Sequence, residues 1–70
     1  MIEIKSSSKP ADVRIFVNDE LFIDQILPHT HCILYPEFKQ PKKSITVMNL
    51  GREEFHCNNQ RVSPKQIIIY

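Results

Sequence analysis

Residues 13–23 read VRIFVNDELFI, and this stretch decides the fold class of the protein. Apolar side chains stand at every second position in its first half, a period that predicts a half-buried β-strand over 12–17. The apolar residues after the centre predict a second strand over 20–26. Asn18 and Asp19 tolerate positive φ angles, so they predict a two-residue hairpin turn between these strands.

The rest of the chain repeats this pattern of short, apolar or alternating stretches. Turn residues, mainly proline, serine and asparagine, separate these stretches from one another. Ile is β-branched and frequent, whereas Ala and Gly occur once each, which favours strands over helices. Further strands are therefore predicted at 2–5, 30–35, 44–48, 53–57, 60–62 and 66–70.

Two more turn signals stand between predicted strands. Asn58-Asn59 suits a second two-residue hairpin turn. Asn49–Arg52 contains Gly51, at a position where a hairpin turn with a bulge needs a left-handed residue. No segment has a sustained helical period; the best helical candidate is 19–27, with one short turn around 24–28 left open.

These strands and turns predict the fold class: an all-β, small antiparallel β-sandwich or open barrel of six to eight short strands joined by hairpins. The chain of 70 residues is long enough for one domain, 1–70, with a thin core. It shows no internal sequence repeat. The run 67–69 is apolar on both faces, so we expect this strand to be covered on both sides or paired with another chain.

The stretches VRIFVNDELFIDQILP (13–28) and KKSITVMN (42–49) also support a sandwich. Their rhythm resembles that of small PEGA-type and transthyretin-like β-sandwich modules. Those modules have an Asn or Asp turn between two strands, then a Pro, then a later strand similar to 45–47. The chain lacks the glycines that those modules carry at the first turn and before the later strand.

Composition excludes several functional classes. The net charge is +1, which gives no bulk electrostatic attraction to nucleic acid. No apolar run approaches the roughly 20 residues that span a bilayer. Residues 1–5 are too polar for a signal peptide, so we expect a cytoplasmic location with free thiols.

A catalytic constellation is also missing from the sequence. The paired carboxylates at 19–20 and 53–54 stand at turns or on an exposed strand, where solvated charge is the ordinary explanation. One glycine is too few for a phosphate-binding loop. We therefore expect no enzymatic activity and no cofactor.

All histidines and cysteines stand in two short segments, 29–32 and 56–57. Imidazole and thiolate are good zinc ligands, so a zinc site is one alternative. Its ligands would be His29, His31, His56 and Cys57. A disulfide between Cys32 and Cys57 is a second alternative, and buried free thiols beside exposed histidines are the third.

The leading functional prediction is a protein-interaction module that acts through a sheet edge or a strand face. The protein would be a small accessory or inhibitor protein of bacterial or phage type, and a homodimer through the same edge is its simplest version. The predicted partner-binding residues are Ile67, Ile69 and Tyr70, with Lys42, Lys43 and Arg61 as a rim.

The alternative is a small β-barrel that binds nucleic acid with the basic C-terminal half. Lysine and arginine would contact phosphates, and aromatic rings would stack on bases. The residues concerned are Lys39, Lys42, Lys43, Arg52, Arg61 and Lys65, with the aromatics Phe38, Phe55 and Tyr70.

Overall fold

The structure is a computed structural model that describes residues 1–7, 9–37, 41 and 44–70. It confirms the all-β prediction: these ranges contain eight short strands and no helix, and hence no helix long and apolar enough to cross a membrane. The strands are β1 (Ile2–Ser6), β2 (Asp12–Val17), β3 (Glu20–Ile26), β4 (His31–Leu34), β5 (Ile45–Asn49), β6 (Phe55–Cys57), β7 (Gln60–Val62) and β8 (Ile67–Ile69).

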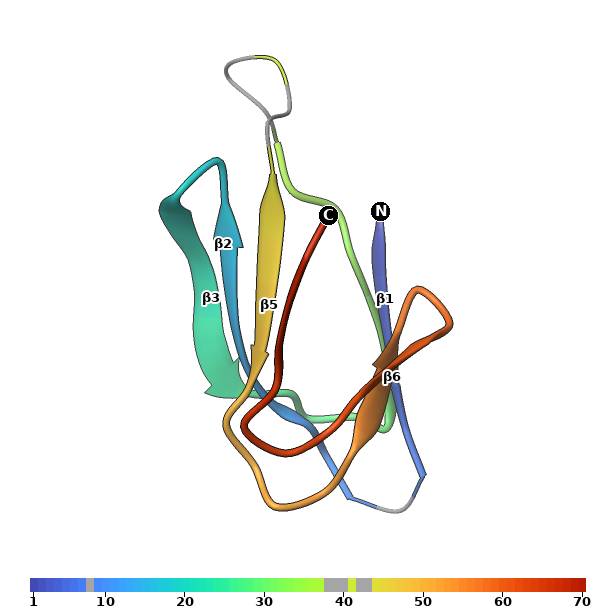
Figure 1. The fold of residues 1–70 in the computed structure, drawn as a ribbon. Coiled ribbons are helices and arrows are strands. Elements are labelled where there is room, and N and C mark those ends of the chain that lie inside the picture. Colours follow the sequence, from blue (N-terminus) through green and yellow to red (C-terminus); the bar gives the residue numbers. More distant parts are fainter. Residues whose placement is uncertain (8, 38–40, 42–43) are drawn as a thin grey trace.

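The strands form two antiparallel sheets that face each other as a sandwich (Figure 1). One, the β1 sheet, has the order β4-β1-β6-β7, and the other, the β2 sheet, has the order β3-β2-β5-β8. Burial alternates along β1, β2 and β5, so one side chain in two enters the core between the sheets. The largest fully buried side chains include Ile2, Ile4, Ile15, Leu27 and Phe55.

Both predicted two-residue hairpin turns are confirmed. Asn18 and Asp19 have φ angles of 51° and 66° and join β2 to β3. Asn58 and Asn59 have φ angles of 49° and 67° and join β6 to β7. Asparagine and aspartate tolerate the left-handed region better than other side chains, which explains why these residues stand at these turns.

Each of these turns also holds the next strand of its sheet through the first asparagine. The backbone N–H of Asn18 donates to the Ser44 carbonyl at 2.9 Å, and the Ser44 backbone N–H donates back to the Asn18 side-chain Oδ1 at 3.2 Å. The backbone N–H of Asn58 donates to the Glu3 carbonyl at 2.9 Å, and the Glu3 backbone N–H donates to the Asn58 side-chain Oδ1 at 2.8 Å. We call each reciprocal pair of hydrogen bonds an asparagine clamp.

The third predicted hairpin, at Asn49–Arg52, is wrong. β5 belongs to the β2 sheet and β6 to the β1 sheet, so these residues cross between the layers. The φ angle of Gly51 is not positive. The buried side chain of Asn49 stabilises the crossover instead. Its Nδ2 donates to the carbonyls of Glu53 (2.9 Å) and Val62 (3.0 Å), and its Oδ1 accepts from the Gly51 backbone N–H at 2.9 Å.

Two other expectations change. The segment 24–28 contains no helical turn, because β3 continues to Ile26. The irregularity of β3 lies earlier, at a bulge between Leu21 and Ile23, where the register shifts opposite Phe16 and Ile15. The strand 67–69 is not central: β8 lies at the edge of the β2 sheet, with Ile68 buried and Ile67 and Ile69 exposed.

The topology contains a repeat that the sequence did not reveal. If β1, β2, β3 and β4 are exchanged with β5, β6, β7 and β8, the order of the β1 sheet becomes that of the β2 sheet read backwards. The two clamps are exchanged with each other by the same operation, and so are the pairs Ile4–Cys57 and Ile45–Val17. The two halves of the fold therefore share one topology and one pattern of strand pairing.

The asparagine clamp gives a stability prediction. Asn58→Ala should lower the free energy of unfolding by about 2–4 kcal/mol, because alanine is strained at a left-handed φ and cannot accept from the Glu3 N–H. Asn59→Gly, one residue on, should leave it unchanged or raise it by up to about 1 kcal/mol, because glycine suits this position. Urea unfolding followed by circular dichroism measures both; equal effects would argue against the clamp.

Candidate interaction face

The outer face of the β2 sheet carries rows of side chains that the strand register places side by side. One row crosses all four strands through the cross-strand pairs of Phe16 with Leu21 and Thr46, and of Thr46 with Ile69. The next row joins Arg14 to Asp24 and Met48, and Met48 to Ile67. We call the apolar members of these rows the apolar face: Phe16, Leu21, Met48, Ile67 and Ile69.

The apolar face is accessible to solvent. Leu21, Ile67 and Ile69 are 57%, 52% and 69% exposed, and Phe16 and Met48 are half-buried. Among the described residues, the ion pair on these rows joins Arg14 Nε to Asp24 Oδ2 at 3.1 Å, at the β3 end of the second row. The row of Leu21, Phe16, Thr46 and Ile69 therefore carries no formal charge from β3 to β8, and the row of Arg14 carries none from β5 to β8.

The shared topology of the two halves provides an internal comparison for this face. The row of Leu21, Phe16, Thr46 and Ile69 corresponds to a row on the outer face of the β1 sheet made of Arg61, His56, Lys5 and His31. All four residues of this row on the β1 sheet are exposed. Positions that are geometrically equivalent thus carry polar side chains on one sheet and mostly apolar side chains on the other.

Neighbouring carboxylates pair with the polar row. His31 Nε2 lies 2.9 Å from Glu3 Oε2, and Arg61 Nε lies 3.4 Å from Glu54 Oε2. The Lys5 ammonium is 4.0 Å from the same Glu3 oxygen. This is the ordinary surface of a soluble sheet, in which both signs of charge are mixed.

Of the four sheet edges, β8 carries the fewest features that prevent pairing with another strand. β3 has the charged residues Glu20 and Asp24 and a bulge, β7 has Arg61, and β4 has His31. Charges and bulges on edges oppose the addition of further strands. β8 consists of three isoleucines.

The structure separates the predicted partner-binding residues. Ile67 and Ile69 lie together on the apolar face, whereas Arg61 lies on the opposite outer face of the sandwich. Tyr70 turns inward: its hydroxyl lies 3.1 Å from the Cys57 Sγ and 3.1 Å from the Asn58 Nδ2. Lys42 and Lys43 lie outside the described residues.

Sequence reasoning missed Phe16, Leu21 and Met48. The alternation of 13–17 already placed Phe16 on the face away from the core, and a large apolar residue there was the available signal. Only the register shows that Leu21, Met48 and the β8 isoleucines share that face.

The four predicted zinc ligands do not converge. His31 and His56 flank Lys5 on the outer face of the β1 sheet, whereas Cys57 points into the core and His29 lies in the exposed bend before β4. In the ranges that the structure describes, no group of three or more His, Cys, Asp or Glu side chains is arranged to hold a metal ion.

Cys32 and Cys57 are both free thiols. Each is paired with Ile4, one from β4 and one from β6, so β1 lies between them. Two strand spacings amount to about 9–10 Å, beyond the roughly 7 Å between Cα atoms that a disulfide can bridge. The third alternative, buried free thiols beside exposed histidines, holds for Cys57 and the three histidines, whereas Cys32 is half-buried.

The residues of the nucleic-acid alternative are also dispersed. Phe55 is 1% exposed in the core, so its ring is not available for stacking on a base. Arg61 contacts Glu54 on the β1 sheet, and Arg52 belongs to the crossover after β5. Phe38 and Lys39 lie outside the described residues.

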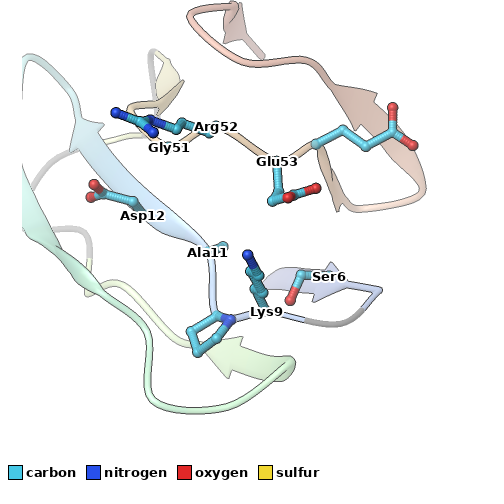
Figure 2. A pocket seen from close by; sticks show the side chains of 9 residues that line it. Ser6, Lys9, Ala11, Asp12, Gly51, Arg52 and Glu53 are labelled. Atoms are coloured by element: carbon cyan, nitrogen blue, oxygen red, sulfur yellow. The ribbon is translucent and has the colours of Figure 1, made fainter.

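A hollow of about 270 Å³ opens at one end of the sandwich, between the β1–β2 connection and the β5–β6 crossover (Figure 2). In this view Lys9 points toward the space between Ser6 and Glu53, while Arg52 and Asp12 are seen on the left. Charges of both signs line the hollow, so it selects neither an anion nor a cation. Its lining is Ser6, Lys9, Pro10, Ala11, Asp12, Gly51, Arg52, Glu53 and Glu54.

Comparisons with protein-family models, with curated proteins and with solved structures found no match to this chain. The similarity to PEGA-type and transthyretin-like modules is therefore confined to the rhythm of strands and turns noted above.

The burial of Cys57 predicts unequal thiol reactivity. Burial raises the pKa of the Cys57 thiol, and the side chain is 0% exposed, whereas Cys32 is half-buried. Iodoacetamide at neutral pH should modify Cys32 at least about tenfold faster than Cys57 in the folded protein, because alkylation needs an accessible thiolate. Peptide mass spectrometry measures the alkylation rates of both thiols. A Cys57 rate that is the same in the folded and the unfolded protein would contradict the burial of Cys57.

The contact between Cys57 and Tyr70 predicts a loss of stability at high pH. Burial, strengthened by their hydrogen bond, raises the pKa of Tyr70 above its ordinary 10.0, and burial raises the pKa of Cys57 above 9.0. The unfolded chain releases these protons first, so the free energy of unfolding should be constant below about pH 9 and fall above it. Tyr70→Phe should reduce the fall; urea unfolding between pH 7 and about 10.5 tests this, and a flat profile would contradict it.

Proposed function

We propose that this protein is a non-enzymatic protein-interaction module that binds a partner protein on its apolar face. The observation that carries the proposal is the contrast between the two equivalent outer rows: His56 and His31 on one sheet correspond to Phe16 and Ile69 on the other. Because the backbone positions are equivalent, folding itself does not require apolar side chains there.

The energetics support a covered face. Fully burying an isoleucine or phenylalanine side chain stabilises a contact by about 1.5–3 kcal/mol. Ile67, Ile69 and Leu21 leave more than half of their surface to solvent, and they share one face with two further large apolar residues. Contiguous apolar patches of this kind on small soluble domains mark interaction surfaces.

The chemistry of the face favours a protein over the other ligand classes. Among the described residues of these rows, the one cation is Arg14, which is paired with Asp24 and therefore offers little attraction to a phosphate backbone. The rows are spread over the surface of a sheet. The hollow described above, which could hold a small molecule, lies elsewhere, between the connections at one end of the sandwich. A partner protein with an apolar surface of its own fits this face, in keeping with a small accessory or inhibitor protein of bacterial or phage type.

Two matched substitutions test the proposal. Phe16→Asp places a charge in the middle of the apolar face, and His56→Asp places the same charge at the equivalent position of the other sheet. Proteins captured by the wild-type chain should be retained by His56→Asp and lost from Phe16→Asp. Calorimetry with the purified partner should give an affinity at least about tenfold weaker for Phe16→Asp, since the charge would be buried unpaired.

Circular dichroism of both variants shows whether each keeps the fold. A partner that binds wild type and Phe16→Asp equally but not His56→Asp would move the function to the β1 sheet. A salt-sensitive shift with single-stranded nucleic acid, lost on Arg61→Ala and kept by Phe16→Asp, would favour the nucleic-acid alternative instead.

A further inference from the structure

The hydrogen bonds of β8 show which of its backbone groups point away from the sheet. Tyr70 and Ile45 exchange both of their backbone hydrogen bonds, and Asn49 N–H donates to the Gln66 carbonyl. In an antiparallel ladder the bonded residues alternate, so the Gln66 carbonyl and both backbone groups of Ile68 and Tyr70 point to β5, while the Gln66 N–H donates to the Ser63 carbonyl. The N–H and C=O groups of Ile67 and Ile69 therefore point outward, at the edge of the sheet.

We infer that a second copy of this chain pairs with this edge, β8 against β8, antiparallel about a twofold axis at Ile68. The inference rests on the proposed interaction face and names a partner for its edge. In this register Ile67 of one copy lies opposite Ile69 of the other, and Ile69 opposite Ile67. Both are outward-pointing pairs, so each exchanges two hydrogen bonds and four form in total.

Other registers form fewer hydrogen bonds. Among residues 66–70, an axis at Ile69 or at Ile67 gives one symmetric pair with two bonds. Lys65 cannot extend the ladder, because its φ of 65° places it in the left-handed region at the turn before the strand. The geometry of the strand and its turn thus selects the axis at Ile68.

Side chains and charge also suit a second copy. Twofold pairing places each edge opposite itself, so an edge that carries charge sets like charges close together. The strand 67–69 carries no charged residue, and its pairing stacks the β-branched Ile67 and Ile69 of one copy on those of the other. Self-pairing of β3 or β7 would instead bring Asp24 or Arg61 close to its own copy.

The size of the contact sets the expected affinity. Stable interfaces bury about 1,200–2,000 Å² in total, and two strands this short bury less. We therefore expect a concentration-dependent dimer with a dissociation constant on the order of 100 μM. The dimer would join two β2 sheets into one sheet, so that the two apolar faces become a single continuous surface for the partner.

Two proline variants test the inference with matched chemistry. Ile69→Pro removes an outward N–H without removing a bond to β5. Ile33→Pro does the same at the equivalent edge, because Thr30 bonds to Ser6 and the ladder leaves Ile33 pointing outward from β4. Sedimentation from about 10 μM to 1 mM should show dimers of wild type and Ile33→Pro, and at least about tenfold weaker association of Ile69→Pro.

Amide hydrogen exchange of the wild-type protein gives a second measurement that needs no variant. The Ile67 and Ile69 amides should become protected as concentration rises, while the Ile33 amide should not change. A monomer at about 1 mM, or a dimer that Ile33→Pro weakens and Ile69→Pro does not, would overturn the inference.

Phe16→Asp separates this result from the proposed function. It alters the apolar face and leaves the β8 backbone unchanged, so it should lose the partner protein and keep the dimer. A monomeric wild type that still binds its partner through Phe16 would overturn the dimer and leave the interaction face standing.

Discussion

The rest of this fold depends on the clamp that each hairpin makes with the next strand of its sheet. Asn18 and Asn58 have left-handed φ angles, which turn the chain. The Asn18 Oδ1 accepts a hydrogen bond from the Ser44 backbone N–H, next to β5, and the Asn58 Oδ1 accepts one from the Glu3 backbone N–H in β1. One side chain thus sets both the turn and the register of the inner pair of strands. Because a shift of one residue exchanges the buried and exposed faces, this register decides which side chains form the core.

The two clamps give the molecule two similar halves, and the halves differ where the core imposes nothing. Inner positions are apolar in both, for example Ile4 and Ile45, since both sheets cover the same core. Outer positions differ: the β1 sheet carries charged and imidazole side chains in mixed pairs, and the β2 sheet carries Phe16, Met48 and the β8 isoleucines. The proposal of an interaction face rests on this difference between the two outer faces.

Most strands were predictable because their cause is local. Alternation over 12–17 and the tolerance of asparagine and aspartate for positive φ lie in neighbouring residues, and both two-residue turns follow from them. The error at Asn49–Arg52 has a different cause. A turn signal shows that the chain changes direction, but not whether it returns in the same sheet or crosses to the other; the buried hydrogen bonds of Asn49 decide that.

The sequence by itself determined the strands and the two hairpin turns, because period, turn chemistry and residue type act within a few positions. It also directed attention to Ile67 and Ile69. The tertiary structure alone decided that β8 is an edge, that Cys32 and Cys57 lie on either side of β1, and that Phe16 shares a face with the β8 isoleucines. Those facts depend on which strands are neighbours, which is set by long-range packing and the clamps.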